Sequence, residues 1–184
     1  MATPVIRALA LLTALLCGFA SAAEEPPPAY QMIAIAHGIP SVVLYSVALQ
    51  ESGARIRGQL VPWPWTLNVA GAGYRFATRK DACKALMIAL ATAGPARVDV
   101  GLGQTNIAAN GHRYSSPCEG LDPYKNLAVT AEILSEQKAK GGSWIDAAGR
   151  YHRPAGGAPA ARYRESFARH LSRVTGINLL ATNP

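Results

Sequence analysis

Hydrophobic and polar positions along the 184-residue chain predict a mainly helical protein. Apolar residues recur at helical spacing in five segments, and each segment has a recognisable start or stop. In the first, Pro40 and Ser41 favour a start and Gly53 a stop. The last segment places Tyr163 and Phe167 on one apolar face. The predicted helices are 41–52, Thr78 to the stop at Gly94-Pro95, Asp122 to Gly141-Gly142, 143–151 and 159–174.

Three short segments predict strands. Thr66–Val69 and Tyr74–Ala77 are joined through Gly71 to Gly73, and Arg97–Leu102 follows a helix. We expect irregular chain over Val61–Trp65, because its two prolines interrupt both helices and sheet ladders. The predicted fold class is therefore α+β, mainly helical, with a small antiparallel sheet.

The N-terminal residues 1–22 are typical of a secretory signal peptide. One basic residue, Arg7, precedes an apolar run, and small residues up to Ala22 form a cleavage pattern. The run is too short to span a bilayer, and Leu16 stands where a lipoprotein signal needs a small residue before Cys17. We predict cleavage after Ala22, export to the periplasm and no stable membrane anchor afterwards. A flexible lead then covers 23–29, the folded domain 30–176 and a C-terminal tail 177–184.

Charge narrows the classes of partner. The formal net charge is +7, and loss of Arg7 with the signal peptide lowers it by one. About 160 residues remain, which is enough for one hydrophobic core and too few for two ordinary domains. A basic exported protein favours an anionic polymer such as peptidoglycan. Nucleic acid is disfavoured, because no basic and aromatic array is present.

Two cysteines remain after cleavage, Cys83 and Cys118. In an oxidising compartment an even pair predicts a disulfide, and its loop would enclose the segment from Gly101 to Asn106. The alternative is a pair of unlinked buried thiols. Metal ligation is disfavoured, because no cysteine or histidine lies beside them at zinc spacing.

Glu51 is the candidate for chemistry. It falls in the last turn of the apolar helix 41–52, where the helix macrodipole and desolvation both favour the protonated carboxyl. Both effects should raise its pKa above the ordinary value of about 4.3. A carboxyl that stays neutral near neutral pH can act as a general acid. The alternative is a helix-end glutamate that points into water.

Four motifs in sequence order resemble the soluble lytic transglycosylase family, whose members cut the glycan strands of peptidoglycan. They cover residues 35 to 155, most of the mature chain. They are Glu51-Ser52, Gly101-Leu102-Gly103-Gln104-Thr105-Asn106, Asp122-Pro123 followed by Asn126-Leu127, and Ala147-Ala148-Gly149-Arg150-Tyr151-His152. The resemblance implies a lysozyme-like, goose-type fold and a lyase that acts in cell wall degradation. The arginine-tyrosine-histidine form of the last motif resembles the small specialised members encoded with conjugation, type IV secretion and pilus systems, whose components are then possible partners.

The resemblance also implies a role for each matched residue. Glu51 would be the single acid and base, with Ser52 supporting the site and Tyr151 facing the glutamate. The expected substrate and support set is Ser52, Gly101, Leu102, Gly103, Gln104, Asn106, Asn126 and Tyr151. Asn126 would fix the glycine-rich segment, Gly101 to Gln104, through backbone hydrogen bonds. Gly103 stands where many members carry methionine, which should leave a smaller side chain beside the sugar cleft.

Each role has a structural alternative. Gly101 and Gly103 could relieve a tight strand end, Gln104 could satisfy buried backbone, and Tyr151 could be a core residue. A further pair, Trp63 and Trp65, could stack on sugars or fill the core.

The implied reaction needs no metal or cofactor. Glu51 would protonate the β-1,4 bond between N-acetylmuramic acid and N-acetylglucosamine and then help to form a 1,6-anhydro end. Ordinary glycosidases use a second carboxylate. Asp81 is better explained as a helix cap, whereas Asp99 lies two residues before Gly101 and stays open. A hydrolytic lysozyme that uses Asp99 and a non-catalytic factor that docks a secretion apparatus on peptidoglycan are the alternatives.

Overall fold

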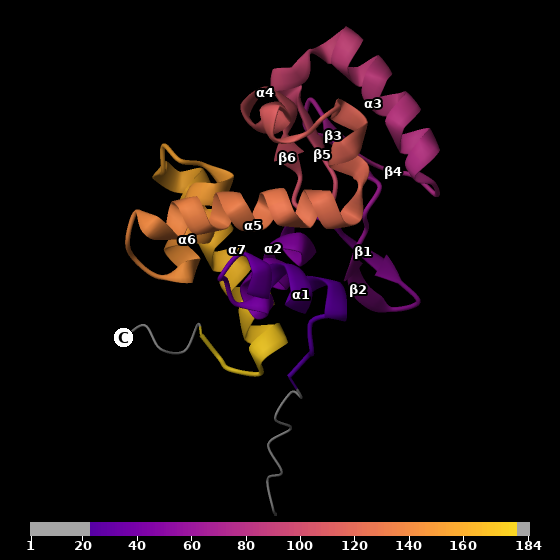
Figure 1. Cartoon of the computed structure of the whole chain (residues 1–184). Helices are drawn as coiled ribbons and strands as arrows, with labels where there is room; N and C mark the ends of the chain where they lie inside the picture. Colours follow the sequence, from indigo (N-terminus) through magenta and orange to yellow (C-terminus); the bar gives the residue numbers. More distant parts are fainter. Residues whose placement is uncertain (1–22, 180–184) are drawn as a thin grey trace, which may run out of the picture.

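A computed structural model describes residues 23–179, and the predicted signal peptide lies outside this range. The described chain is α+β and mainly helical, with small antiparallel sheets (Figure 1). The helices are α1 (Pro28–Ala36), α2 (Ser41–Ser52), α3 (Arg79–Ala93), α4 (Ile107–Asn110), α5 (Pro123–Ala139), α6 (Trp144–His152) and α7 (Gly157–Thr175), with 3₁₀ turns η1 (Pro95–Arg97), η2 (Gly111–Arg113) and η3 (Pro117–Leu121). The strands are β1 (Gly53–Ile56), β2 (Gln59–Pro62), β3 (Thr66–Val69), β4 (Ala72–Arg75), β5 (Val98–Val100) and β6 (Thr105–Asn106).

All five predicted helices are present, and three of them begin at a capping side chain. Thr78 accepts a hydrogen bond from the backbone N–H of Asp81, Asp122 caps α5, and Ser143 forms a capping box with Asp146. Gly53 follows the last residue of α2, as expected. Sequence analysis did not predict α1, a short helix with proline in its first turn.

Two hydrophobic clusters form two lobes. The larger one joins α1, α2, α5, α6 and α7 around residues such as Leu44, Leu134 and Phe167. The smaller one packs α3 against the four-stranded sheet through Leu67, Leu86 and neighbouring residues. In Figure 1 the sheet and α3 lie above α5, while α1 and α2 lie below it. The long α5 therefore runs between the two lobes.

The four-stranded sheet has the order β4-β3-β5-β6, and every neighbouring pair is antiparallel. The hairpin between β3 and β4 is tighter than predicted. Val69 pairs with Ala72, and the turn is Ala70-Gly71, both with positive φ. Asn68 accepts a hydrogen bond from the Gly71 N–H, which stabilises this turn and moves β4 two residues earlier than expected.

The expectation of irregular chain over 61–65 was only partly correct. Val61 and Pro62 end strand β2, which pairs with β1 in a separate hairpin. Pro62 is tolerated because it occupies the last pair of the ladder, opposite Gly53. The hairpin directly follows the helix that carries Glu51.

The lead at 23–29, expected to be flexible, is docked on the helical lobe. Glu24 donates its backbone N–H to the carbonyl of Val174, and its carboxylate accepts hydrogen bonds from Tyr45 at 2.8 Å and from Arg173 Nε at 2.8 Å. Pro26 is buried. Composition alone predicted a mobile spacer, but these contacts come from residues far away in the sequence.

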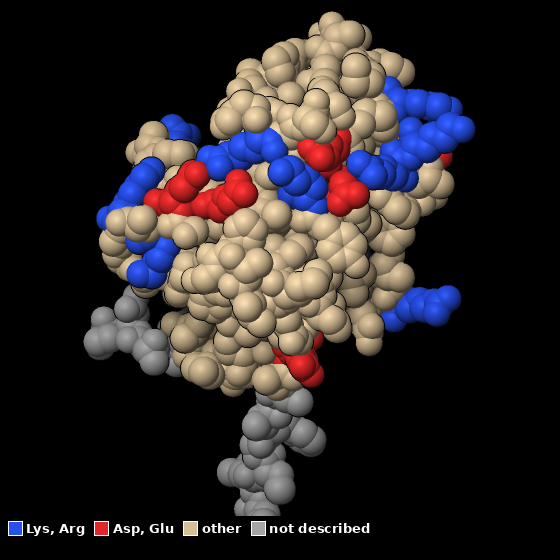
Figure 2. Space-filling view, viewed as in Figure 1, with Lys and Arg blue, Asp and Glu red and all other residues tan. Residues whose placement is uncertain are grey.

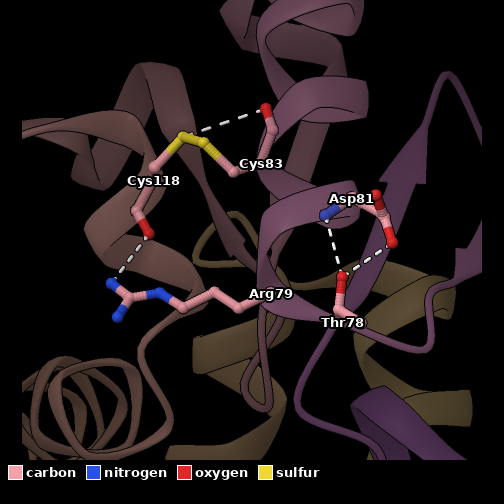
Figure 3. Close-up of a disulfide and its surroundings, with 5 residues drawn as sticks. All are labelled: Thr78, Arg79, Asp81, Cys83 and Cys118. Carbon is pink, nitrogen blue, oxygen red and sulfur yellow. Dashed lines mark hydrogen bonds between the residues drawn. A yellow bond between two sulfur atoms is a disulfide. The ribbon is translucent and has the colours of Figure 1, made fainter.

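The predicted disulfide between Cys83 and Cys118 is present and joins α3 to η3 (Figure 3). Beside it, the Arg79 guanidinium donates to the carbonyl of Cys118, and Thr78 and Asp81 cap the start of α3. The disulfide thus closes a loop that contains β5, the glycine-rich segment and β6.

Charged side chains form a mixed band across the middle of the face seen in Figure 2, where basic and acidic residues alternate around α5. Ion pairs join Arg113 to Glu132 and Glu136, and Arg79 to Asp122. The net positive charge is therefore not gathered into one basic patch on this face. Within residues 23–179, no single helix is long and apolar enough to cross a membrane, although α1 and α2 together pass that test across a 118° bend.

Candidate functional site

A cavity of about 470 Å³ lies between the two lobes. Side chains from α2, α5 and α6 line one part of it, and residues of β3, β5, β6 and α4 line the other. Glu51 and Asp99 are two of its carboxylates, and Gln104, Asn106 and Tyr151 also line it. The structure therefore brings together residues from three of the four motifs around one cavity.

Glu51 lies in the last turn of α2 and is only partly exposed. The hydroxyl of Tyr163 in α7 donates a hydrogen bond to its Oε1 at 2.6 Å. Desolvation raises the pKa of Glu51 to about 7; the Tyr163 hydrogen bond acts to lower it, and the nearby Asp99 acts to raise it further. A carboxyl with this pKa is half protonated near neutral pH and can both donate and accept a proton.

Sequence analysis expected Tyr151 to face Glu51, but the tyrosine that hydrogen-bonds Glu51 is Tyr163. Tyr151 lines the cavity, but its hydroxyl donates to the carbonyl of Gly103. Burial and the proximity of Glu51 raise the pKa of Tyr151 well above its ordinary value, so it remains a neutral donor. Tyr151 thus holds the glycine-rich segment, and Tyr163 holds the glutamate.

Sequence analysis missed Tyr163 as a site residue because it placed this tyrosine on the apolar face of the last helix. That placement is correct, since Tyr163 is 5% exposed and packs in the larger cluster. Its hydroxyl is the polar end of a core residue. No local signal distinguishes it, because its partner lies 112 positions away in the sequence.

Gly103 is packed closely against the side chains of Thr130 and Tyr151. A Cβ atom at this position would lie 2.0 Å from Oγ1 of Thr130 and 2.8 Å from the hydroxyl of Tyr151. At Gly101, φ is +79° and a Cβ would lie 2.4 Å from Nδ2 of Asn126. Close packing requires glycine at both positions, and positive φ adds a second requirement at Gly101.

Asn126 makes the backbone contacts expected of it. Its Oδ1 accepts a hydrogen bond from the N–H of Gly103 at 2.8 Å, and its Nδ2 donates to the carbonyls of Val100 and Gly120, both at 3.0 Å. The side chain is fully buried. It therefore ties α5 and η3 to the glycine-rich segment.

Ser52 holds the same segment from α2, and the segment's own Leu102 and Gln104 anchor it from within. The Ser52 hydroxyl donates to the carbonyl of Leu102 at 2.8 Å, which fixes the end of α2 against the segment. Leu102 is buried in the larger cluster. Gln104 donates its amide to the carbonyls of Thr66 and Gly101, so the alternative interpretation, satisfaction of backbone, describes its amide group.

Asp99 and Asn106 face each other across β5 and β6. Asn106 donates to Oδ1 of Asp99 at 2.9 Å, and its own Oδ1 caps α4. Burial raises the pKa of Asp99, while Asn106 and His152 act in the opposite direction. Asp81 accepts a hydrogen bond from the Thr78 hydroxyl at the start of α3, whereas Asp99 lines the same cavity as Glu51.

The two tryptophans stand apart from this arrangement. Trp63 donates to the carbonyl of Phe76 and meets Trp65 edge to face at 6.0 Å between ring centroids. Trp65 packs against the smaller cluster. Among the described residues that line the cavity, neither tryptophan is found. His152 is exposed and lines the cavity.

Comparisons with protein-family models, with curated proteins and with solved structures found no match to this chain. Residues 23–179 contain no group of three or more His, Cys, Asp or Glu side chains arranged to hold a metal ion.

Proposed function

We propose that this protein is an exported, lysozyme-like peptidoglycan lytic transglycosylase of the periplasm. The observation that carries the proposal is the environment of Glu51. Its partly buried carboxyl faces a cavity of about 470 Å³, has a pKa of about 7 and accepts a hydrogen bond from Tyr163. This combination suits a single residue that acts first as acid and then as base.

In the proposed reaction, Glu51 gives its proton to the glycosidic oxygen of N-acetylglucosamine as the bond to C1 of N-acetylmuramic acid breaks. The substrate's own acetamido group stabilises the positive charge that develops at C1. The Glu51 carboxylate then takes the proton of the C6 hydroxyl, whose oxygen bonds to C1. This step gives a 1,6-anhydro end, consumes no water and returns Glu51 to its protonated form.

The residues around Glu51 have supporting roles in this proposal. Tyr151, Asn126 and Ser52 each hydrogen-bond to the glycine-rich segment from a different helix. They hold the segment as one wall against which a glycan strand would lie. We also propose that the protein acts within a conjugation, type IV secretion or pilus system, and this part of the proposal rests on the motif resemblance alone.

Hydrolysis is a second candidate, and Asp99 is the observation that favours it. Asp99 lines the same cavity as Glu51 and raises its pKa, so the two carboxyl groups act on each other. A second carboxylate in a glycosidase attacks the sugar or activates water. With Asp99 in that role, the enzyme would release reducing ends instead of anhydro ends.

Mass spectrometry of the muropeptides released from purified peptidoglycan tests the proposal. Mature wild-type protein should release anhydro-muropeptides, and Glu51→Gln should release none. Asp99→Asn separates the two candidates, because it should preserve anhydro products if Glu51 acts alone. Reducing-end products that disappear in Asp99→Asn would establish hydrolysis. If neither the wild type nor any variant releases products while all still bind peptidoglycan, the docking role would replace both.

A further inference from the structure

His152 lines the cavity and stacks on Tyr163. Their ring centroids are 4.6 Å apart and the ring planes differ by 9°. His152 is the last residue of α6, and Tyr163 lies in α7. The same Tyr163 donates its hydroxyl to Glu51 at 2.6 Å. Three side chains from three helices thus lie in the order imidazole, phenol, carboxyl.

The position of a tyrosine hydroxyl follows from the orientation of its ring. Tyr163 is buried, so core residues fix the inner part of its side chain, and His152 covers one ring face. An aromatic pair of this kind is stabilised by more than the area that it buries. Without His152, that face of Tyr163 would lie against solvent or cavity, and the ring would have more freedom to turn.

Helix α6 also holds the glycine-rich segment through the residue before His152. Tyr151 donates its hydroxyl to Gly103, and its neighbour stacks on Tyr163. The C-terminal end of one helix therefore contacts both the wall of the cavity and the support of the glutamate. This arrangement explains the tyrosine-histidine pair, whose histidine the motif comparison left without a role.

The charge state of His152 is set by its neighbours. Burial and the adjacent Arg153 lower the pKa of His152, whereas Asp99 acts to raise it. The imidazole is then mostly neutral at neutral pH. A neutral ring stacks on a phenol without adding a cation beside Glu51, so the contact is one that another flat aromatic ring can replace.

We propose that His152 is a positioning residue that holds Tyr163 in the orientation from which it hydrogen-bonds Glu51. This inference rests on the proposed function, in which Glu51 is the acid and base. His152 acts through Tyr163 and takes no proton from the substrate. Substitution should therefore affect turnover more than substrate binding, and only while Tyr163 still has its hydroxyl.

The experiment is a double-mutant cycle on anhydro-muropeptide release by the mature protein. Its variants are His152→Ala, His152→Phe, Tyr163→Phe and the double variant His152→Ala/Tyr163→Phe, with His112→Ala as a matched control on an exposed histidine of η2. We expect His152→Ala to lower kcat roughly three- to tenfold with little change in KM, on the scale of a lost aromatic pair. His152→Phe should retain most of the activity. The double variant should equal Tyr163→Phe.

The pH profile supplies a readout that a general loss of structure would not produce. The Tyr163 hydrogen bond lowers the pKa of Glu51. Weakening it should therefore move the alkaline limb of kcat to higher pH, in the same direction for His152→Ala and Tyr163→Phe. A single cooperative urea transition, with a midpoint well above the assay conditions, would show that each variant remains folded.

The outcomes are distinct. If the wild type releases no anhydro products, the proposed function fails before His152 is tested. If the wild type is active but His152→Ala matches it, or Tyr163→Phe matches it, the positioning role is wrong. Additive losses in the double variant would overturn the inference by showing that His152 acts on the substrate directly, and so would a His152→Phe variant as slow as His152→Ala.

Discussion

Adding one methyl group at Gly103 should destabilise the protein, although its φ lies outside the left-handed region. The new Cβ would lie 2.0 Å from Oγ1 of Thr130, where an ordinary contact is 3.4 Å or more. Thr130 cannot move away freely, since its hydroxyl donates to the carbonyl of Asn126 at 2.8 Å and its side chain is fully buried.

Overpacking of this kind costs roughly 1–3 kcal/mol, and a broken buried hydrogen bond adds about 1 kcal/mol. We therefore expect Gly103→Ala to lower the free energy of unfolding by about 2–4 kcal/mol, and the urea midpoint by about 1–2 M for an m value of about 2 kcal/mol/M. Urea unfolding of the mature, disulfide-linked protein, followed by tryptophan fluorescence and circular dichroism, measures the change.

Thr130→Ala provides the internal test, because it removes both of the Thr130 atoms that the new Cβ meets, Oγ1 and Cγ2. Gly103→Ala/Thr130→Ala should therefore be more stable than the sum of the two single losses, by about 1–2 kcal/mol. Gly111→Ala is the matched control, since its Cβ would meet only Ile107 at 3.5 Å. A Gly103→Ala midpoint close to that of the control, or an additive double variant, would refute the packing argument.

Three further predictions concern charge, the disulfide and the docked lead. Because burial raises the pKa of Glu51 to about 7, ionising this carboxyl in the folded state costs free energy. The wild type therefore keeps its full stability below about pH 4.5 and loses part of it as the pH rises from 4.5 through 7. Glu51→Gln should thus gain about 3 kcal/mol over the wild type by pH 8 and little at pH 4.5, and a constant difference in urea unfolding would contradict this. Replacing Cys83 and Cys118 by alanine opens a loop of sequence separation 35 and should cost about 3–4 kcal/mol, which urea unfolding under non-reducing conditions measures. Glu24→Ala should lower the melting temperature, at a cost of about 1 kcal/mol, whereas the exposed Glu25→Ala should not, and equal temperatures would mean that the lead contributes nothing.

Helices were predictable where a few neighbouring residues carried the whole signal. Thr78 and Asp81, Asp122 with Pro123, and Ser143 mark three helix starts that the structure confirms. The β1–β2 hairpin was missed because its prolines and short strands resemble irregular chain until the two strands pair. The docking of Glu24 was missed for a similar reason, since Tyr45 and Arg173 lie far away along the sequence.

Local sequence patterns were enough to predict the mainly helical α+β class, the disulfide and the place of Glu51 in the last turn of an apolar helix. These depend on periodicity, capping and residue type within short segments. Three features could be seen only once the chain was folded: Tyr163 and not Tyr151 hydrogen-bonds Glu51, Asp99 shares its cavity, and Thr130 fills the space beside Gly103. The physical reason is that the packing of α7 and α6 against α2 and α5 sets these distances, and no local pattern encodes the orientation of one helix against another.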